Sequence, residues 1–252
     1  MTVQDIRDLL NTLAPEDTAF EWDNVGLMVG DPNAEVRSIL TALDCTDEVI
    51  AEAKIRGANL IVTHHPLIFH APYSIVTGDP DGDRIMELIK SGIAVISMHT
   101  NLDRAAHGVN DVLADILGLR NIALLPGGDN VCRMGNLPAS METDAFLNHV
   151  KTALNVDALR VSRTECRVEK VAVGGGACGE YLRAAHDAGC DAFVTADVKH
   201  HEYIEAAHLG LLLVDATHYA TENVVIRPLA DYLRRRCPNV AVAQWENPVR
   251  LY

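Results

Sequence analysis

The sequence predicts an α/β protein composed of two similar α/β units that arise from a degenerate internal duplication. Apolar runs of strand length alternate with segments of helical periodicity, which is typical of parallel β-α units. The same succession occurs in both halves of the chain. Histidines and carboxylates follow several of the apolar runs, and parallel sheets place their chemistry at the carboxyl ends of strands.

The first half opens with a helix over 3–13, because apolar residues recur there at helical spacing and Pro15 ends the pattern. A polar and aromatic loop follows at 21–27. We expect Trp22 of this loop to pack, like Trp245, with the polar neighbours of Trp22 lining a pocket. The elements expected next are a strand at 36–43, a helix at 47–56, a strand at 59–63, a helix at 81–91, a strand at 93–98 and a helix near 107–117.

The second half repeats this order. A shift of 132 positions aligns six identical residues in thirty ungapped positions, among them Val62 with Val194 and Thr63 with Thr195. The expected strand, helix and strand coincide under the same shift. The alternative is chance similarity between any two β-α-β units.

The tail of the chain reads as a helix over 223–236 and a strand over 240–245. The segment 126–130, with proline, two glycines, aspartate and asparagine, is the strongest linker signal. The expected units are 1–126 plus 223–252 for the first and 127–222 for the second.

Composition and charge restrict the classes of function. The chain has 252 residues, enough for one large or two small domains, and its formal net charge of −14 disfavours a nucleic-acid backbone as partner. No apolar run reaches about 18 residues, so we expect no membrane-spanning helix. The six cysteines include no C-x-x-C pair, and the first residues lack the basic-then-apolar pattern of a signal peptide. A cytoplasmic protein with reduced thiols is expected.

Three of the apolar runs end in imidazole groups, at His64-His65, His99 and His218. Neighbouring residues of a strand point to opposite faces, so the adjacent pair serves one site only at a strand end or in a turn. Pro66 supports such an ending, because proline cannot continue a central ladder. Two adjacent histidines are thus able to reach two ions.

Two of the histidines have an acid four residues later, Asp103 after His99 and Glu222 after His218. Either pair is also compatible with a simple ion pair at the start of a helix. Imidazole and carboxylate together form the ligand set of zinc, manganese or iron, and one carboxylate can bridge two cations. The sequence therefore predicts a metal centre with enough ligands for two ions.

Four ordered motifs carry a resemblance to a known family: Glu21-Trp22-Asp23-Asn24-Val25-Gly26-Leu27, Thr63-His64-His65-Pro66, His99-Thr100-Asn101-Leu102-Asp103 and Asp215-Ala216-Thr217-His218-Tyr219-Ala220-Thr221-Glu222. They resemble the NIF-three-like family, also called the YbgI type, whose members carry the name GTP cyclohydrolase 1 type 2 homolog. The resemblance runs nearly end to end, and the chain corresponds to the short form without an inserted domain.

This resemblance implies two α/β units around a dinuclear metal site, in a toroidal hexamer. The five implied ligands divide between two ions: His64 and His218 hold one, His65 and Asp103 hold the other, and Glu222 bridges both. By the same resemblance, His99 and His201 lie close to the site without clear ligand roles.

The chain departs from the family pattern at Thr217, Ala196 and Cys178, where the family usually has glycine. Thr217 directly precedes His218 and is expected to alter the local backbone, because glycine tolerates a positive φ and threonine does not. The ligand positions all match, so these departures bear on pocket shape and substrate more than on metal binding.

The turn at Gly174–Gly179 fits the dinucleotide-binding pattern G-x-G-x-x-G, and Asp197 follows it 18 residues later. A tight strand-to-helix turn is the plainer interpretation, since the other half of the chain lacks the motif. A third interpretation is that N–H groups at the helix start hold a substrate phosphate.

The residues favour a metal-dependent hydrolase, and the resemblance implies one of cyclohydrolase or phosphoesterase type. Two divalent ions per chain, of zinc, iron, manganese, nickel or cobalt, are expected to activate a water as nucleophile. His201 and His99 are the candidate catalytic acid–base groups. The expected partners are a small substrate, phosphorylated or nucleotide-like, and further copies of the chain in a homohexamer.

Two alternatives remain open. A non-catalytic metal-binding, metal-delivery or protein-interaction scaffold of the same family predicts exchangeable metal and no turnover. A nucleotide-binding regulatory module that uses the Gly174–Gly179 turn predicts ligand binding that survives chelation.

Overall fold

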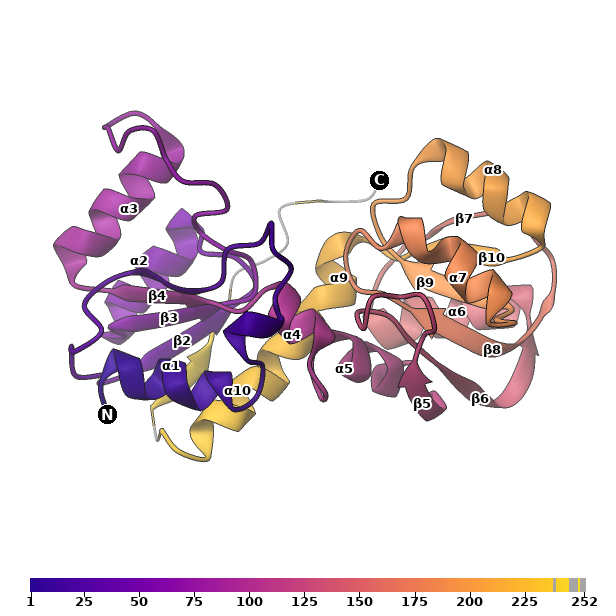
Figure 1. Cartoon of the computed structure of the whole chain (residues 1–252), viewed down its shortest axis with the longest axis horizontal. Coiled ribbons are helices and arrows are strands. Elements are labelled where there is room, and N and C mark those ends of the chain that lie inside the picture. The colour runs from indigo at the N-terminus through magenta and orange to yellow at the C-terminus, as the bar shows by residue number, and fades with distance from the viewer. Residues whose placement is uncertain (238, 245–248, 250–252) are drawn as a thin grey trace. The chain divides into compact units, whose positions relative to one another are not determined.

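The chain folds into two compact units, each with its own sheet and hydrophobic core. Unit 1 comprises Met1–Ala105 and the segment that begins at Ile226, and unit 2 comprises Ala106–Val225. The computed structural model describes residues 1–237, 239–244 and 249 (Figure 1).

Unit 1 contains a five-stranded sheet in the order β1-β4-β3-β2-β11. Its strands are β1 (Gly26–Val29), β2 (Ile39–Ala42), β3 (Leu60–Thr63), β4 (Ala94–Ser97) and β11 (Val240–Val242). Strands β11, β2, β3 and β4 are parallel, and β1 runs antiparallel to β4. Every residue of β2, β3 and β4 is buried, as expected for parallel strands covered on both faces.

Helices cover both faces of this sheet (Figure 1). The helices of unit 1 are α1 (Val3–Asn11), α2 (Asp47–Arg56), α3 (Pro80–Ser91), α4 (Thr100–Arg104) and α10 (Ile226–Arg234). Leu40, Ile61 and Val95 point to one face, where they share a core with Val49 of α2 and Leu88 of α3. Helices α1 and α10 lie on the opposite face (Figure 1).

The boundaries of α2 and α3 follow from local sequence. The side chains of Thr46 and Asp79 accept hydrogen bonds from the first turn of each helix, and so cap otherwise unsatisfied N–H groups. Gly57 and Gly92 end the two helices in the left-handed conformation, at φ of 67° and 63°, which glycine adopts without strain. Strands β3 and β4, which follow these two glycines, therefore start from fixed points.

Unit 2 contains a six-stranded sheet in the order β5-β6-β8-β9-β10-β7. Its strands are β5 (Arg120–Leu124), β6 (Arg133–Glu142), β7 (Arg160–Val161), β8 (Arg167–Val173), β9 (Ala192–Thr195) and β10 (Leu212–Asp215). Strands β8, β9 and β10 are parallel, whereas β5, β6 and β7 pair antiparallel. The sheet is thus mixed, which corrects the expectation of a repeated parallel arrangement alone.

The helices of unit 2 are α5 (Val109–Ile116), α6 (Thr143–Leu154), α7 (Leu182–Asp187), α8 (His200–Leu209) and α9 (His218–Glu222). Leu113 of α5 and Phe146 of α6 share a core with Val171, Val194 and Val214 of the parallel strands. Helices α7 and α8 lie over the other face of the sheet (Figure 1).

The parallel strands of the two units share one register. Strands β2, β3 and β4 lie side by side in unit 1, as β8, β9 and β10 do in unit 2. The corresponding partners are Ile39 with Leu60 and Leu60 with Ala94 in unit 1, and Val171 with Ala192 and Ala192 with Leu212 in unit 2. The first two strands of each arrangement are related by the shift of 132 residues found in the sequence, and the third strands, at Ala94 and Leu212, by a shift of 118 residues.

In each unit, an antiparallel strand pairs with the last of the three parallel strands. In unit 1, Leu27 of β1 lies beside Ile96 of β4. In unit 2, Val161 of β7 lies beside Val214 of β10. A five-residue helix then follows the last parallel strand in both units, α4 in one and α9 in the other.

The unit boundaries differ from those expected at 126/127 and 222/223. Helix α5 and strand β5 belong to unit 2, because β5 pairs with β6 and Leu113 packs in the core of unit 2. The segment 126–130 is part of the turn between β5 and β6, not a linker between units. Strand β11 ends at Val242, and Trp245 lies outside the described residues.

Candidate metal centre

Three histidines of unit 1 meet where β3 and β4 end. The N–H of Met98 donates to the carbonyl of Thr63 at 2.9 Å, so the two chains stay side by side beyond the strands. His64 and His65 follow β3, and His99 follows β4. Parallel pairing thus delivers three imidazoles to one edge of the sheet.

The three rings are close enough to share a cation. Their centroids lie 5.1 Å apart for His64 and His65, 5.3 Å for His64 and His99, and 5.8 Å for His65 and His99. One ring nitrogen of each lies within 4.8 Å of those of the other two. Buried Asp103 adds a carboxylate, with Oδ1 3.6 Å from Nε2 of His64. The structure therefore groups all four predicted site residues of unit 1.

Each of these rings is held through Nδ1 by an oxygen acceptor. The acceptors are the carbonyl of Met98 for His64 at 2.8 Å, Asp44 for His65 at 2.6 Å and Asp23 for His99 at 2.8 Å. We assign the ring proton to Nδ1, because each partner is an acceptor. The lone pair is then on Nε2. Metal-binding histidines typically have this arrangement, in which an outer hydrogen bond fixes the tautomer and the ring orientation.

Asp23 is fixed by two donors besides His99. The backbone N–H and the hydroxyl of Thr100 donate to its Oδ2 at 3.0 and 2.5 Å. Burial raises the pKa of Asp23, but the hydrogen bonds from His99 and Thr100 and the charge of His99 outweigh burial and lower the pKa to about 2. Asp23 therefore remains a carboxylate through the physiological range and keeps His99 oriented.

The low pKa of Asp23 predicts a loss of stability in acid. Its contribution, about 2 kcal/mol from the shift relative to an ordinary aspartate, should be complete above pH 4 and disappear as the pH falls towards 2. The measurement is urea unfolding of the protein and of Asp23→Asn between pH 2 and 6. The two free energies of unfolding should differ most above pH 4 and converge near pH 2. A difference that is constant over this range would contradict the assignment.

Unit 2 places His218 and Glu222 on one face of α9. Nε2 of His218 lies 2.9 Å from Oε2 of Glu222, and Nδ1 lies 2.7 Å from Oδ2 of Asp197. Glu222 is buried, and His218 is partly exposed. The spacing of four residues that the sequence suggested is therefore realised as one face of a short helix.

Both ring nitrogens of His218 face carboxylates. A neutral imidazole has only one proton, so it can donate to one of them. A second positive group is therefore needed at Nε2, either a ring proton or a cation between Nε2 and Glu222. His64 shows the same relation, with an acceptor at Nδ1 and Asp103 near Nε2. The donor sets of both units and their polarity thus fit divalent metal binding.

Three N–H groups of the Gly174–Gly179 turn are already occupied within the protein. Those of Gly175, Gly176 and Cys178 donate to the side chains of Asn110, Thr221 and Thr195, at 2.7, 3.0 and 3.1 Å. A three-residue 3₁₀ helix and the six-residue α7 follow the turn. The dinucleotide and phosphate interpretations therefore gain no support from these three N–H groups.

The same turn instead contacts Glu222. Gly176 has a φ of +64°, and a Cβ at this position would lie 2.1 Å from Oε1 of Glu222 and 3.2 Å from Cε1 of His218. Glycine is needed here both for the backbone conformation and for the close approach of the carboxylate. The turn thus packs directly against Glu222 and His218, the candidate ligands of unit 2.

Thr217 adopts an unusual backbone conformation, with φ of 70° and ψ of 144°. A β-branched residue is strained there, as the family's preference for glycine at this position suggested. The strained residue directly precedes His218. Backbone contacts hold it, since Thr217 N–H donates to Asp215 at 3.1 Å and its carbonyl accepts from Thr221.

Thr217→Gly should stabilise the protein. Relief of the positive φ contributes about 1–3 kcal/mol, and the greater freedom of glycine in the unfolded chain offsets roughly 0.5–1 kcal/mol of this gain. Thermal and urea unfolding of the substituted protein test the effect. Asn155→Gly is the matched control, because Asn155 has a φ of 52° in the left-handed region that asparagine tolerates. Equal changes at the two positions would show that Thr217 is not strained.

The two candidate catalytic histidines are placed differently. His99 belongs to the histidine cluster of unit 1. His201 is exposed near the start of α8 in unit 2. Within the described part of the chain, none of the groupings of three potential ligands includes His201. We therefore favour His99 as the acid–base group.

The residues that orient the rings were not predicted from the sequence. Asp44 and Asp197 lie in loops after β2 and β9, and nothing in their local pattern marks them as partners of His65 and His218. Asp23 lies in one of the recognised motifs, so its position was a usable signal. The role of all three carboxylates as partners of the histidine rings depends on tertiary contacts.

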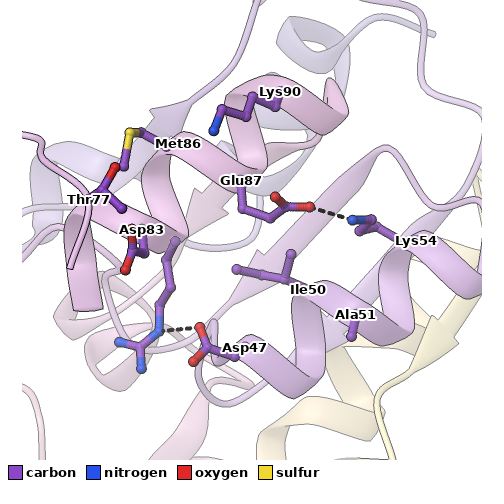
Figure 2. Close-up of a pocket in the computed structure, with 10 residues that line it drawn as sticks. Asp47, Ile50, Ala51, Lys54, Thr77, Asp83, Met86, Glu87 and Lys90 are labelled. Carbon is purple, nitrogen blue, oxygen red and sulfur yellow. Dashed lines mark hydrogen bonds and ion pairs between the residues drawn. The ribbon is translucent and has the colours of Figure 1, made fainter. Parts of the chain in front are cut away.

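A charged hollow of about 390 Å³ lies between α2 and α3 of unit 1 (Figure 2). Its acids and bases neutralise each other: Lys54 pairs with Glu87, and Arg84 pairs with Asp47 at 3.0 Å. None of the predicted site residues lines it. Exposed pairs of this kind contribute about 0–1 kcal/mol to stability.

In the part of the chain that the structure describes, no helix has the length and apolar character needed to cross a bilayer.

Comparison with known proteins places the chain in a family. A family model described as Duf34/NIF3 (NGG1p interacting factor 3) matches residues 1–248. A GTP cyclohydrolase 1 type 2 homolog of Clostridium perfringens is 35% identical over 242 residues, which cover 94% of this chain and 92% of the relative. A protein of the same name from Streptomyces coelicolor is 37% identical over 225 residues, covering 84% and 79%.

A solved structure agrees with these matches. The crystal structure of a Bacillus cereus protein related to NIF3 has a TM-score of 0.94 at 26% identity, and the match covers 100% of this chain and 99% of that chain. The motif resemblance is therefore confirmed, and the chain belongs to the Duf34/NIF3 family.

Proposed function

We propose that the protein binds two divalent metal ions and uses them as a metal-dependent hydrolase of small molecules. One observation carries this proposal: in each unit, an imidazole is anchored through Nδ1 and has Nε2 directed at a buried carboxylate. Two such arrangements in one chain are costly as isolated ion pairs, because burial removes solvation from the carboxylates. Bound divalent cations would stabilise these carboxylates.

We propose further that the ligands of the two units form one dinuclear centre. By motif position, His64 and His218 would hold one ion, His65 and Asp103 the other, and Glu222 would bridge them. The family membership supports this division, because the division follows from the motifs on which the resemblance to this family rests.

An internal duplication would account for the paired arrangement. The shared strand register, the matching antiparallel edge strand and the five-residue helix after the last parallel strand all support it. Helices α4 and α9 then occupy equivalent places and carry Asp103 and Glu222 at equivalent positions. The His64-His65 pair has no histidine counterpart, since Ala196 and Asp197 occupy the matching positions.

When bound, two divalent ions supply Lewis acidity and lower the pKa of a nearby water. His99 would move the proton. Its Nδ1 is fixed by Asp23, so Nε2 would accept a proton from the water and return it to the leaving group. Asp23 would stabilise the imidazolium that forms between these steps, which requires that Asp23 remain ionised.

The substrate and the assembly are also proposals. The name of the relatives, GTP cyclohydrolase 1 type 2 homolog, favours a nucleotide-like or phosphorylated small molecule. A toroidal homohexamer would have about six times the chain mass of 27.4 kDa. Light scattering coupled to size exclusion chromatography measures that mass directly.

A reconstitution assay tests the function. The protein is stripped with a chelator, reloaded with zinc, iron, manganese, nickel or cobalt, and assayed on phosphoesters, nucleotides and cyclic amides. Hydrolysis should depend on metal and disappear in His65→Ala, whereas His208→Ala, a change at an exposed histidine, should retain it. If His65→Ala abolished metal binding but left every hydrolytic activity unchanged, the hydrolase proposal would be wrong. Bound metal without turnover on any substrate would favour a metal-binding or metal-delivery role.

A further inference from the structure

An exposed aromatic surface lies beside His99 in unit 1. Trp22 is 59% exposed and Phe69 is 40% exposed, whereas the large apolar side chains of this unit are mostly buried. We call Trp22, Phe69 and the supporting Phe20 the aromatic platform. The expectation that Trp22 packs is thus met on one side of the ring only.

The rings of the platform are arranged for stacking. Phe20 stacks on Trp22, with centroids 5.4 Å apart and an angle of 18° between the planes. Because Phe20 covers one face of the indole, the exposure of Trp22 is concentrated on the other face. Phe69 stands at 56° to the indole, 6.0 Å away, and forms a side wall. Together the rings offer one open face and one edge to a flat ligand.

The loop that carries Trp22 is held in place from both sides. Asp23 accepts hydrogen bonds from His99 and Thr100, and the amide of Asn24 donates to the carbonyl of Ile68 at 2.6 Å. The second bond also ties this loop to the segment that carries Phe69. An exposed tryptophan on an anchored loop loses little conformational entropy when a ligand binds, which favours affinity.

The platform adjoins the candidate acid–base group. The imidazole of His99 lies 6.4 Å from Trp22 and 6.1 Å from Phe69, and it stands on edge to both rings. A ring stacked on Trp22 would therefore have its edge towards His99 and the neighbouring His64 and His65. Such a combination of an aromatic wall and a few convergent polar groups is typical of a small-molecule site.

We propose that the aromatic platform binds a planar heteroaromatic ring by stacking it on the open face of Trp22. The identification of this ring compound as the substrate rests on the proposed function, whereas the stacking itself does not. A second protein surface is the other conceivable occupant. It is disfavoured because two exposed side chains beside a polar histidine cluster are small compared with the roughly 800 Å² that each partner of a stable protein complex buries.

The tryptophan content of the chain permits a direct test. The sequence has two tryptophans, Trp22 and Trp245, so Trp245→Phe leaves Trp22 as the only indole fluorophore. Guanosine monophosphate, a pterin and a pyridine carboxylate serve as planar probes, and ribose 5-phosphate serves as the non-aromatic probe. Fluorescence titrations are made on metal-loaded and on chelator-stripped protein, and calorimetry gives affinities for variants that lack the fluorophore.

At least one planar probe should quench Trp22 in a saturable manner in both metal states, and ribose 5-phosphate should not. Trp22→Ala should weaken binding of that probe by about tenfold or more, as expected for loss of a stacked base, and Trp22→Phe should restore most of the affinity. Phe69→Ala should weaken it less. Tyr73→Ala, a change at a fully exposed ring in the same segment as Phe69, is the matched control and should have no effect.

The proposal is overturned if none of the three planar probes quenches saturably, if Trp22→Ala leaves the affinity unchanged, or if quenching depends on protein concentration through self-association alone. Stacking that persists in stripped protein, combined with a failed hydrolysis assay, would retain the platform and reject the hydrolase. Hydrolysis that is indifferent to Trp22→Ala in both kcat and KM would retain the hydrolase and reject the stacked ring compound as its substrate.

Discussion

Glu222→Gln should reduce the bound metal from two ions per chain to one or none. The substitution keeps the shape of the side chain, which matters because Glu222 is only 3% exposed, but it removes the negative charge that faces Nε2 of His218 at 2.9 Å. A neutral amide cannot bridge two cations as a carboxylate does. Elemental analysis of the purified protein, reloaded with excess metal and desalted, measures the change.

Glu180→Gln is the control, because Glu180 is exposed in the same unit and its replacement makes the same change in charge. It should retain both ions. If Glu222→Gln also retained two ions with unaltered affinity, Glu222 would not be a ligand, and the proposed division of ligands between two ions would fail.

Gly176→Ala should displace the carboxylate of Glu222 from its position and so weaken metal binding. The new Cβ would lie 2.1 Å from Oε1 of Glu222, so the side chain must leave its seat. Displacing a ligand in this way is expected to lower metal affinity by about 10–100-fold. The positive φ adds about 1–2 kcal/mol of strain and the crowding about 1–3 kcal/mol, so the free energy of unfolding should fall as well.

Gly189→Ala separates the two contributions. Gly189 has a φ of +72°, close to that of Gly176, but a Cβ there meets nothing within 4 Å. It should show the backbone strain in urea unfolding and no change in metal affinity by competition with a chromogenic chelator. Similar metal affinities for the two variants would mean that the Gly176 turn does not seat Glu222.

The parallel strands and their helices were predictable because local signals agree with the tertiary structure. Strand β3 is an uninterrupted apolar run, and such runs are typical of strands buried on both faces. Helix α2 has a capping threonine at one end and a glycine at the other. Its predicted bounds, 47–56, are those of the structure.

The antiparallel elements were missed for a physical reason. Strand β1 has only four residues of mixed burial, and β5 is exposed along most of its length, so their three-residue apolar stretches do not mark buried strands. The pairing of these strands with β4 and β6 is determined by tertiary contacts. The turn residues at 126–130 were real signals, but proline, glycine and asparagine mark a hairpin turn and a domain linker alike.

The candidate site also has a part that the sequence predicted and a part that it did not. Histidines and acids at strand ends pointed to His64, His65, Asp103, His218 and Glu222, and each unit brings its own members together. The anchors of the rings could not be read from sequence. One is a backbone carbonyl, that of Met98, and Asp44 and Asp197 become partners only when separate loops meet.

The anchored histidines and buried carboxylates are proposed to hold two divalent ions. The most direct measurement is the metal content per chain of protein purified without added metal, repeated after chelation and reloading with each candidate ion. We expect saturation at two ions per chain. The loaded form should also have a higher melting temperature, because metal binding stabilises the folded state. Protein that retains no ion after reloading, and whose melting temperature does not respond to metal or chelator, would contradict it.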